Sequence, residues 1–156
     1  IAKYARIYGF GEPTGIDLEG ESGGLVASKQ VKLDIWNEGW RLGDTFNAAI
    51  GQGFNLSTPL QLAVMLSCVA NGGIKHQPYL VDSFLNPDGS VAGKPERNES
   101  KHIDVSQRTI DYMRDGMSAT TEAGGTASYF ASLPKKVAGK TYYGKWSTKK
   151  KIKIKK

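Results

Sequence analysis

A β-strand ending in a Lys-Thr pair is predicted for Val137-Ala138-Gly139-Lys140-Thr141. Its last three residues imitate the end of a phosphate-binding P-loop. Such a loop needs a glycine five residues before Gly139, so that the backbone can wrap around a phosphate. Pro134 occupies that position. The sequence therefore predicts no nucleotide site, and Lys140 and Thr141 need another interpretation.

The chain has 156 residues, which is the length of one domain or of part of one. Hydrophobic residues make up 39% of it, enough for a packed core. No run approaches the roughly 18 apolar residues of a membrane-spanning helix, and no signal peptide is recognised. If the parent protein is anchored in a membrane, we expect the anchor to lie outside this chain.

The net charge of +6 comes from a lysine cluster at the C-terminal end. Six of the 21 basic residues belong to it, so the remainder carries 15 basic and 15 acidic residues. Domains that bind nucleic acids usually spread Lys and Arg over a folded face. We therefore expect no nucleic-acid partner and interpret the cluster as a solvated tail, although its Lys-Ile alternation leaves open an edge strand. The cluster comprises Lys149, Lys150, Lys151, Lys153, Lys155 and Lys156.

Neither a disulfide nor a metal site is predicted. Cys68 is the single cysteine, and its apolar helical surroundings indicate a small core residue. His76 and His102 are far apart and lack a cysteine or carboxylate at metal-ligand spacing. The Gly-x-Gly pairs at residues 9–11 and 51–53 lack the third glycine of a dinucleotide-binding turn. No cofactor is therefore expected.

A helix is predicted to begin after Thr58. Pro59 suits the first helical position, and Gln61 completes a capping box with Thr58. Asn71-Gly72-Gly73 ends the helix. The largely apolar face between these ends comprises Leu60, Ala63, Val64, Ser67, Cys68 and Ala70.

The N-terminal part of the chain gives a weaker pattern. Residues 1–8 indicate the end of a helix, with Gly9 as its C-cap. Residues 11–43 are rich in glycine, acidic residues and tryptophan without clear periodicity. This composition predicts a long surface excursion with short strands or turns.

The second half is predicted to contain a hairpin and a further helix. Residues 79–85 and 90–92 indicate two strands, joined by a turn at residues 86–89. Apolar residues at helical spacing predict a helix over residues 106–120. The glycines within residues 122–127 end that helix and lead towards the strand that enters Lys140.

Several segments, taken together with Lys140-Thr141, resemble class B penicillin-binding proteins. They follow one another in that family's order over residues 1–141. The resemblance implies an α+β fold, the penicillin-recognising serine transpeptidase fold with an antiparallel sheet flanked by helices, of which only part is present. The segments are Gly9-Phe10-Gly11-Glu12-Pro13-Thr14-Gly15-Ile16-Asp17-Leu18-Glu19-Gly20-Glu21, Gly43-Asp44-Thr45, Ile50-Gly51-Gln52-Gly53, Thr58-Pro59-Leu60-Gln61-Leu62-Ala63 and Thr121-Glu122-Ala123-Gly124-Gly125-Thr126-Ala127.

Enzymes of that family cross-link peptidoglycan. A serine attacks the D-alanyl-D-alanine end of a stem peptide, releases the last D-alanine and passes the acyl group to an amine on a neighbouring strand. The resemblance implies that Lys140 supplies positive charge beside the site and that Thr141 hydrogen-bonds the terminal carboxylate of the substrate. It also implies that the backbone amide of Tyr143 is an oxyanion-hole donor.

The serine nucleophile is expected to be absent from this chain. The family's Ser-x-x-Lys motif needs its serine and lysine one helical turn apart on a buried helix. Ser132-Leu133-Pro134-Lys135 fails because Pro134 disfavours a helical conformation at Leu133. Ser147-Thr148-Lys149-Lys150 lies in the lysine tail, and no Ser-x-Asn motif stands in a suitable place. We therefore expect the chain alone to be inactive.

Tyr142 departs from the family pattern, because a glycine normally follows the Lys-Thr pair. A side chain there would occupy the gap between the strand and the nucleophile helix. Residues 142–156 resemble nothing in the family. The chain is therefore divided into a partial transpeptidase domain at residues 1–141 and an atypical Lys-rich tail at residues 142–156.

The resemblance also implies partners and a location. The partners are a peptidoglycan stem peptide ending in D-alanyl-D-alanine, β-lactams, the missing N-terminal half of the domain and a wall glycosyltransferase. The location is the extracytoplasmic face of a bacterial plasma membrane. Two alternatives stay open: a β-lactam sensor or hydrolase on the same fold, and a non-catalytic interaction module that uses residues 11–43. The block at residues 58–63 favours the wall-building enzymes over a sensor or hydrolase.

Overall fold

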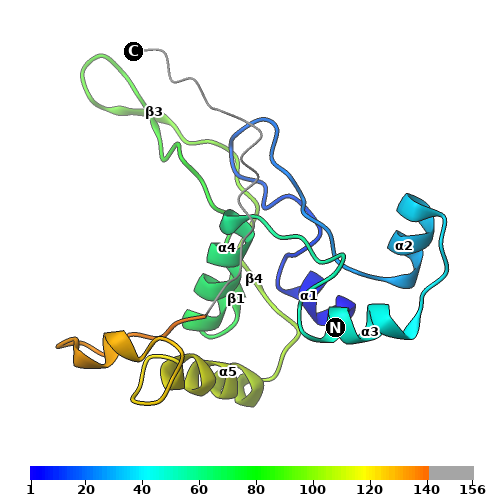
Figure 1. Cartoon of the computed structure of the whole chain (residues 1–156). Coiled ribbons are helices and arrows are strands. Elements are labelled where there is room, and N and C mark those ends of the chain that lie inside the picture. The colour runs from blue at the N-terminus through cyan, green and yellow to red at the C-terminus, as the bar shows by residue number, and fades with distance from the viewer. Residues whose placement is uncertain (141–156) are drawn as a thin grey trace, which may run out of the picture. The chain divides into compact units, whose positions relative to one another are not determined.

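The computed structural model describes residues 1–140, which form two compact units (Figure 1). The first unit is Ile1–Asp111, and the second begins at Tyr112. The elements in chain order are α1 (Ala2–Ile7), α2 (Lys29–Trp36), α3 (Leu42–Ala49), α4 (Pro59–Ala70), β1 (Ile74–Lys75), β2 (Phe84–Leu85), β3 (Val91–Gly93), β4 (Lys101–His102), α5 (Gln107–Ala119) and the 3-10 helix η1 (Ser128–Ser132).

Helix α4 has the ends that its sequence predicts. The Thr58 hydroxyl accepts a hydrogen bond from the Gln61 amide at 3.1 Å, and the Gln61 side chain accepts one from the Thr58 amide at 2.9 Å. This reciprocal pair is the predicted capping box. Asn71 caps the other end, and Cys68 is fully buried, as expected of a small core residue.

Residues 11–43 contain helix α2 and the start of helix α3, although turns and short strands were predicted there. The Ser28 hydroxyl caps α2, and α3 begins where the Asp44 carboxylate accepts the Arg41 amide at 2.7 Å. The two helices are joined by the buried ammonium of Lys32, which donates to Asp44 at 2.7 Å. This ion pair is a tertiary contact that no local pattern shows, so the prediction of irregular structure was wrong for α2 and for the start of α3.

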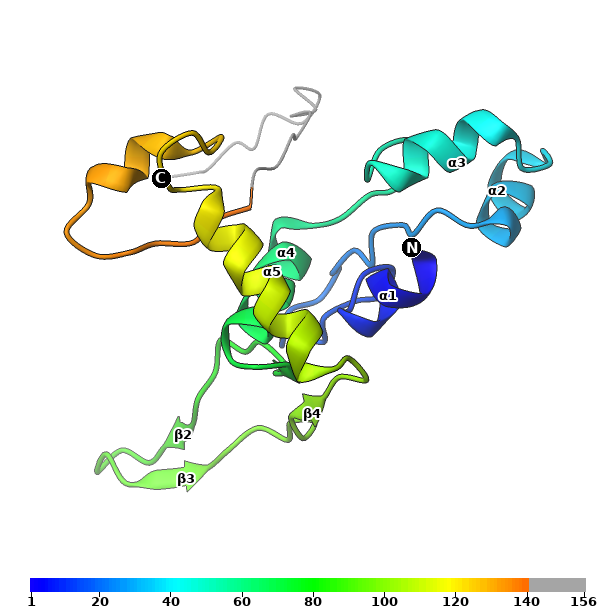
Figure 2. The same cartoon turned by 90° about the horizontal axis from the view of Figure 1, so that it is seen from below.

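The sheets of the first unit are small and antiparallel. Strand β1 pairs with β4, and β2 pairs with β3 (Figure 2). The predicted hairpin is confirmed, because the Asn86 amide donates to the Ser90 carbonyl at 2.8 Å across the turn. The first strand of the hairpin is shorter than predicted: β2 covers only the last two of residues 79–85.

Asp17 explains why the strand predicted over residues 79–85 is short. Its carboxylate accepts the amides of Leu80 at 2.7 Å and of Val81 at 2.8 Å. A backbone amide that donates to a side chain is not available to a strand ladder. The amides of Val81 and Leu80 also hold the pKa of Asp17 below its usual value.

We expect these contacts to be lost in acid. Protonation removes the charge that the two amides stabilise, so the contribution of Asp17 is present at neutral pH and disappears as the pH falls through its lowered pKa. The measurement is the amide proton shift of Leu80 and Val81 between pH 7 and pH 2. Asp17→Asn is the control, because an amide side chain does not titrate. Equal pH dependence in both proteins would contradict the assignment.

Gln61 is the polar centre of the first unit, with 1% of its surface exposed. Its side-chain nitrogen donates to the carbonyl of Glu12 at 2.8 Å and to that of Gly23 at 2.7 Å. Its side-chain oxygen accepts the Thr58 amide. One amide therefore satisfies the N-cap residue of its own helix and two loop carbonyls that are 49 and 38 residues away in sequence.

Gln61→Ala should lower the free energy of unfolding by at least about 2 kcal/mol, because buried backbone groups lose their partners. Helix propensity cannot explain such a loss, since alanine is the better helix former. Gln30→Ala in α2 is the matched control, because the side chain of Gln30 makes an exposed bond to Asp34. It should change stability by less than about 0.5 kcal/mol. Urea unfolding followed by circular dichroism measures both, and similar losses would contradict the role of Gln61.

Helix α5 confirms the helix predicted over residues 106–120, with Ile110 fully buried. The strand predicted at Val137–Thr141 is not found in the part of it that the structure describes. Residues 137–140 form no strand, because the Gly139 amide donates to the Met117 carbonyl of α5 at 2.9 Å rather than to another strand. Thr141 lies outside the described residues.

Candidate functional site

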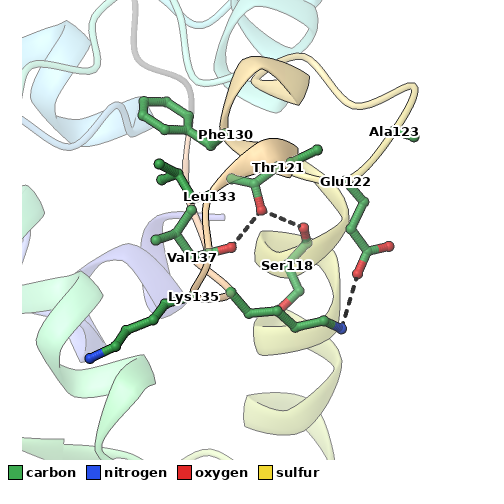
Figure 3. A pocket seen from close by; sticks show the side chains of 10 residues that line it. Ser118, Thr121, Glu122, Ala123, Phe130, Leu133, Lys135 and Val137 are labelled. Atoms are coloured by element: carbon green, nitrogen blue, oxygen red, sulfur yellow. Dashed lines mark hydrogen bonds and ion pairs between the residues drawn. The ribbon is translucent and has the colours of Figure 1, made fainter.

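The second unit contains a pocket of about 360 Å³ between the end of α5 and the segment that leads to Lys140 (Figure 3). Apolar side chains form much of its lining, and an exposed ion pair joins Glu122 to Lys136 at 3.5 Å. Because Val137 lines the pocket, the residues that shape it also place the chain just before Lys140. The lining comprises Ser118, Thr121, Glu122, Ala123, Phe130, Ala131, Leu133, Lys135, Lys136 and Val137.

Two adjacent threonines, here called the threonine pair, connect α5 to this segment. Thr121 is buried, and its hydroxyl lies within hydrogen-bonding distance of the carbonyls of Ser118, at 2.9 Å, and of Val137 (Figure 3). The Thr120 hydroxyl lies 2.7 Å from the Met117 carbonyl and 2.8 Å from the Gly139 carbonyl. Sequence motifs do not reveal this role, because the contacts join residues far apart in the chain. Val137 is 16 residues from Thr121, and Gly139 is 19 residues from Thr120.

The turn after the threonine pair depends on Gly125. A methyl group at this position would lie 2.4 Å from the carbonyl oxygens of Ala119 and Thr120. The absence of a side chain allows the turn to fold back on the end of α5, where the Ala127 amide donates to the Thr120 carbonyl at 2.8 Å. Of the glycines that were predicted to end the helix, Gly125 therefore also permits the close packing of the turn against Ala119 and Thr120.

Gly125→Ala should destabilise the second unit by about 1–3 kcal/mol, the usual range for overpacking, because the backbone must move away from two carbonyl oxygens. Gly116→Ala is the matched control, since it lies within α5 and its new methyl group would meet nothing within 4 Å. That variant should gain about 0.5–1 kcal/mol from helix propensity. Urea unfolding of both variants distinguishes the two effects, and a loss in the control or none in Gly125→Ala would contradict this account.

The predicted site residues are only partly within the described chain. Lys140 is exposed and lies next to Gly139, which the Thr120 hydroxyl contacts. Thr141 and Tyr143, the predicted carboxylate and oxyanion contacts, lie outside the described residues. The structure thus places the chain that leads to the Lys-Thr pair, and the roles of the three residues stay predictions.

Ser132 does not have the surroundings of a nucleophile. It ends the 3-10 helix η1, and its exposed hydroxyl donates to the Tyr129 carbonyl at 3.3 Å. Leu133 is extended, with φ −68° and ψ 144°, as predicted from the proline that follows it. Ser132 and Lys135 are therefore not one turn apart on a helix. Ser147 lies outside the described residues.

The cysteine and the possible metal ligands in the described part of the chain do not form a catalytic arrangement. Burial raises the pKa of the Cys68 thiol, which keeps it neutral. Within residues 1–140, no group of three His, Cys, Asp or Glu side chains is placed to hold a metal ion. Over the same residues, no helix is long and apolar enough to cross a membrane.

Comparison with known proteins identifies the family. The family described as penicillin binding protein transpeptidase domain matches residues 1–153. The chain belongs to this family. It is 34% identical over 143 residues to the peptidoglycan D,D-transpeptidase MrdA of Escherichia coli K12. The matched region comprises 90% of this chain and 22% of the relative. This transpeptidase-family chain therefore spans about a fifth of the length of that relative.

Solved structures agree with the family. PBP2 of Helicobacter pylori in complex with MreC gives a TM-score of 0.68 at 32% identity, over 82% of this chain and 22% of PBP2. PBP3 of Mycobacterium tuberculosis complexed with ampicillin gives a TM-score of 0.61 at 33% identity, over 80% of this chain and 25% of PBP3. The predicted α+β transpeptidase fold, the partial coverage and the resemblance to class B penicillin-binding proteins are all confirmed.

Proposed function

We propose that this chain is the part of a peptidoglycan D,D-transpeptidase domain that holds the carboxyl end of the substrate, and that the serine nucleophile is supplied from outside the chain. The observation that supports the proposal is the pair of hydrogen bonds by which Thr120 and Thr121 position the segment that ends in Lys140. The family supports a role in cell-wall cross-linking.

The proposed reaction is acyl transfer. The serine oxygen forms a bond to the carbonyl carbon of the penultimate D-alanine, the amide bond to the terminal D-alanine breaks, and the hydroxyl proton of the serine passes to the leaving nitrogen, which departs as an amine. An amine of a second stem peptide then takes the acyl group and releases the serine. In this proposal Lys140 attracts the substrate carboxylate and Thr141 hydrogen-bonds it, while the amide of Tyr143 donates to the developing oxyanion.

The proposal extends to ligands, partners and location. β-Lactams would acylate the same serine, and the M. tuberculosis relative complexed with ampicillin supports this. The N-terminal part of the domain and a wall glycosyltransferase are the proposed protein partners. The PBP2 relative in complex with MreC shows that a member of the family assembles with another protein. The proposed location is the extracytoplasmic face of a bacterial plasma membrane.

A chimera tests the proposal. Residues 1–141 replace the matched segment of E. coli MrdA, and acylation by a fluorescent penicillin is followed over time. We expect the chimera to be acylated and the 156-residue chain alone to form no adduct, because Ser132 has no helical lysine partner and Ser147 belongs to a lysine-rich run that resembles no family motif. Lys140→Ala in the chimera should slow acylation by at least about 100-fold through the loss of positive charge beside the reacting serine.

A second chimera that keeps residues 142–156 tests the departure from the family at Tyr142. It should be acylated at least about 100-fold more slowly than the same protein carrying Tyr142→Gly and the relative's residues thereafter, because small displacements damage the geometry of attack. Thermal melting controls for folding of every chimera. An adduct on the chain alone would overturn the proposal, as would a folded first chimera that is never acylated.

A further inference from the structure

We infer that Thr120 and Thr121 are positioning residues that hold one edge of residues 137–139 against the end of α5, and thereby determine the face on which Lys140 presents its ammonium. The inference rests on the proposed function for its catalytic consequence only. The contacts themselves lie within residues 112–140 and do not depend on what the protein does.

Three contacts bring one edge of the segment to α5. The threonine pair reaches the carbonyls of Val137 and Gly139, and the amide of Gly139 donates to Met117 at 2.9 Å. In an extended chain the amide and carbonyl of one residue point to the same side, and those of the next residue point to the other. The contacts skip Ala138, which is the pattern of an extended segment held along one edge.

The edge that faces α5 decides which way Lys140 points. Side chains of an extended chain alternate between faces, and the amide and carbonyl of Ala138 and Lys140 belong to the edge opposite to that of Val137 and Gly139. If the segment turned its other edge to α5, the side chain of Lys140 would move to the opposite face. The threonine pair therefore keeps Lys140 on one face by holding the edge of Val137 and Gly139.

The threonine pair positions the segment without locking it. Each hydroxyl has a single proton, and each has an alternative acceptor within α5, the carbonyl of Met117 for Thr120 and of Ser118 for Thr121. If the segment moves away, neither hydroxyl is left without a partner. Removal of a hydroxyl should therefore change the position of the segment more than it changes global stability.

The first test measures amide hydrogen exchange in the full 156-residue chain by NMR. In Thr120→Val, Thr121→Val and the double variant, the Gly139 amide should exchange faster, by at least about fivefold in the double variant, the change expected from about 1 kcal/mol. Thr120→Ser with Thr121→Ser keeps both hydroxyls and should retain protection. The Ala127 amide is the internal control, because its bond to the Thr120 carbonyl uses no hydroxyl.

Valine is the informative replacement because threonine and valine have similar shapes and helix propensities. Accelerated exchange at both Gly139 and Ala127 would show that the whole turn has loosened and would overturn the inference. Unchanged exchange at Gly139 in the double valine variant would overturn it as well. The serine variant excludes simple crowding, since only the hydroxyl explains a loss with valine and a recovery with serine.

The second test measures acylation by fluorescent penicillin in the MrdA chimera. The double valine variant should be acylated at least about tenfold more slowly at an unchanged melting temperature, and the double serine variant should recover the rate. Normal acylation with fast exchange at Gly139 would refute the positioning role but leave the proposed function intact. If the unaltered chimera is folded and never acylated, the proposed function fails. Hydrogen exchange at Gly139 still tests the contacts of the threonine pair in that case.

Discussion

The side-chain amide of Gln61 satisfies backbone groups of Glu12, Gly23 and Thr58, and the first unit is arranged around it. A buried polar group without a partner is costly, so α4 cannot adopt its position unless both loop carbonyls reach it. The backbone also approaches closely at Gly24, where a methyl group would lie 2.4 Å from the Leu56 carbonyl oxygen and 2.9 Å from the Gln61 oxygen. Helix and loops therefore form together.

Bonds from side chains to the backbone recur wherever the chain lacks regular structure. Asp17 takes the amides of Leu80 and Val81, which a longer strand would have used. The hydroxyls of the threonine pair instead contact carbonyls of the segment before Lys140. Side chains thus take the place of ladder partners at residues 80–81 and at residues 137–139, and neither stretch is a strand.

Sequence patterns predicted the elements whose causes are local. The capping box at Thr58 and the turn after Asn86 depend on neighbouring residues, and both were found. Helices α2 and α3 were missed because their shared ion pair, Lys32 with Asp44, joins residues on two different elements. The family was recognised from ordered motifs, one of which begins at Thr121, whereas the contacts of Thr120 and Thr121 with the segment before Lys140 depend on the fold.

The difference between the predicted motifs and the contacts that were not predicted has a physical cause. The chemistry of a Lys-Thr pair is fixed by residue type, but its usefulness depends on where the pair is held, and a displacement on the order of 1 Å is enough to impair attack. A single hydroxyl bond contributes only about 1 kcal/mol. Such a bond does little for the fold as a whole, yet it is large enough to hold a segment of chain in one position. Residues like Thr120 and Thr121 can therefore adjust the site of a member of this family without any change in the Lys-Thr pair itself.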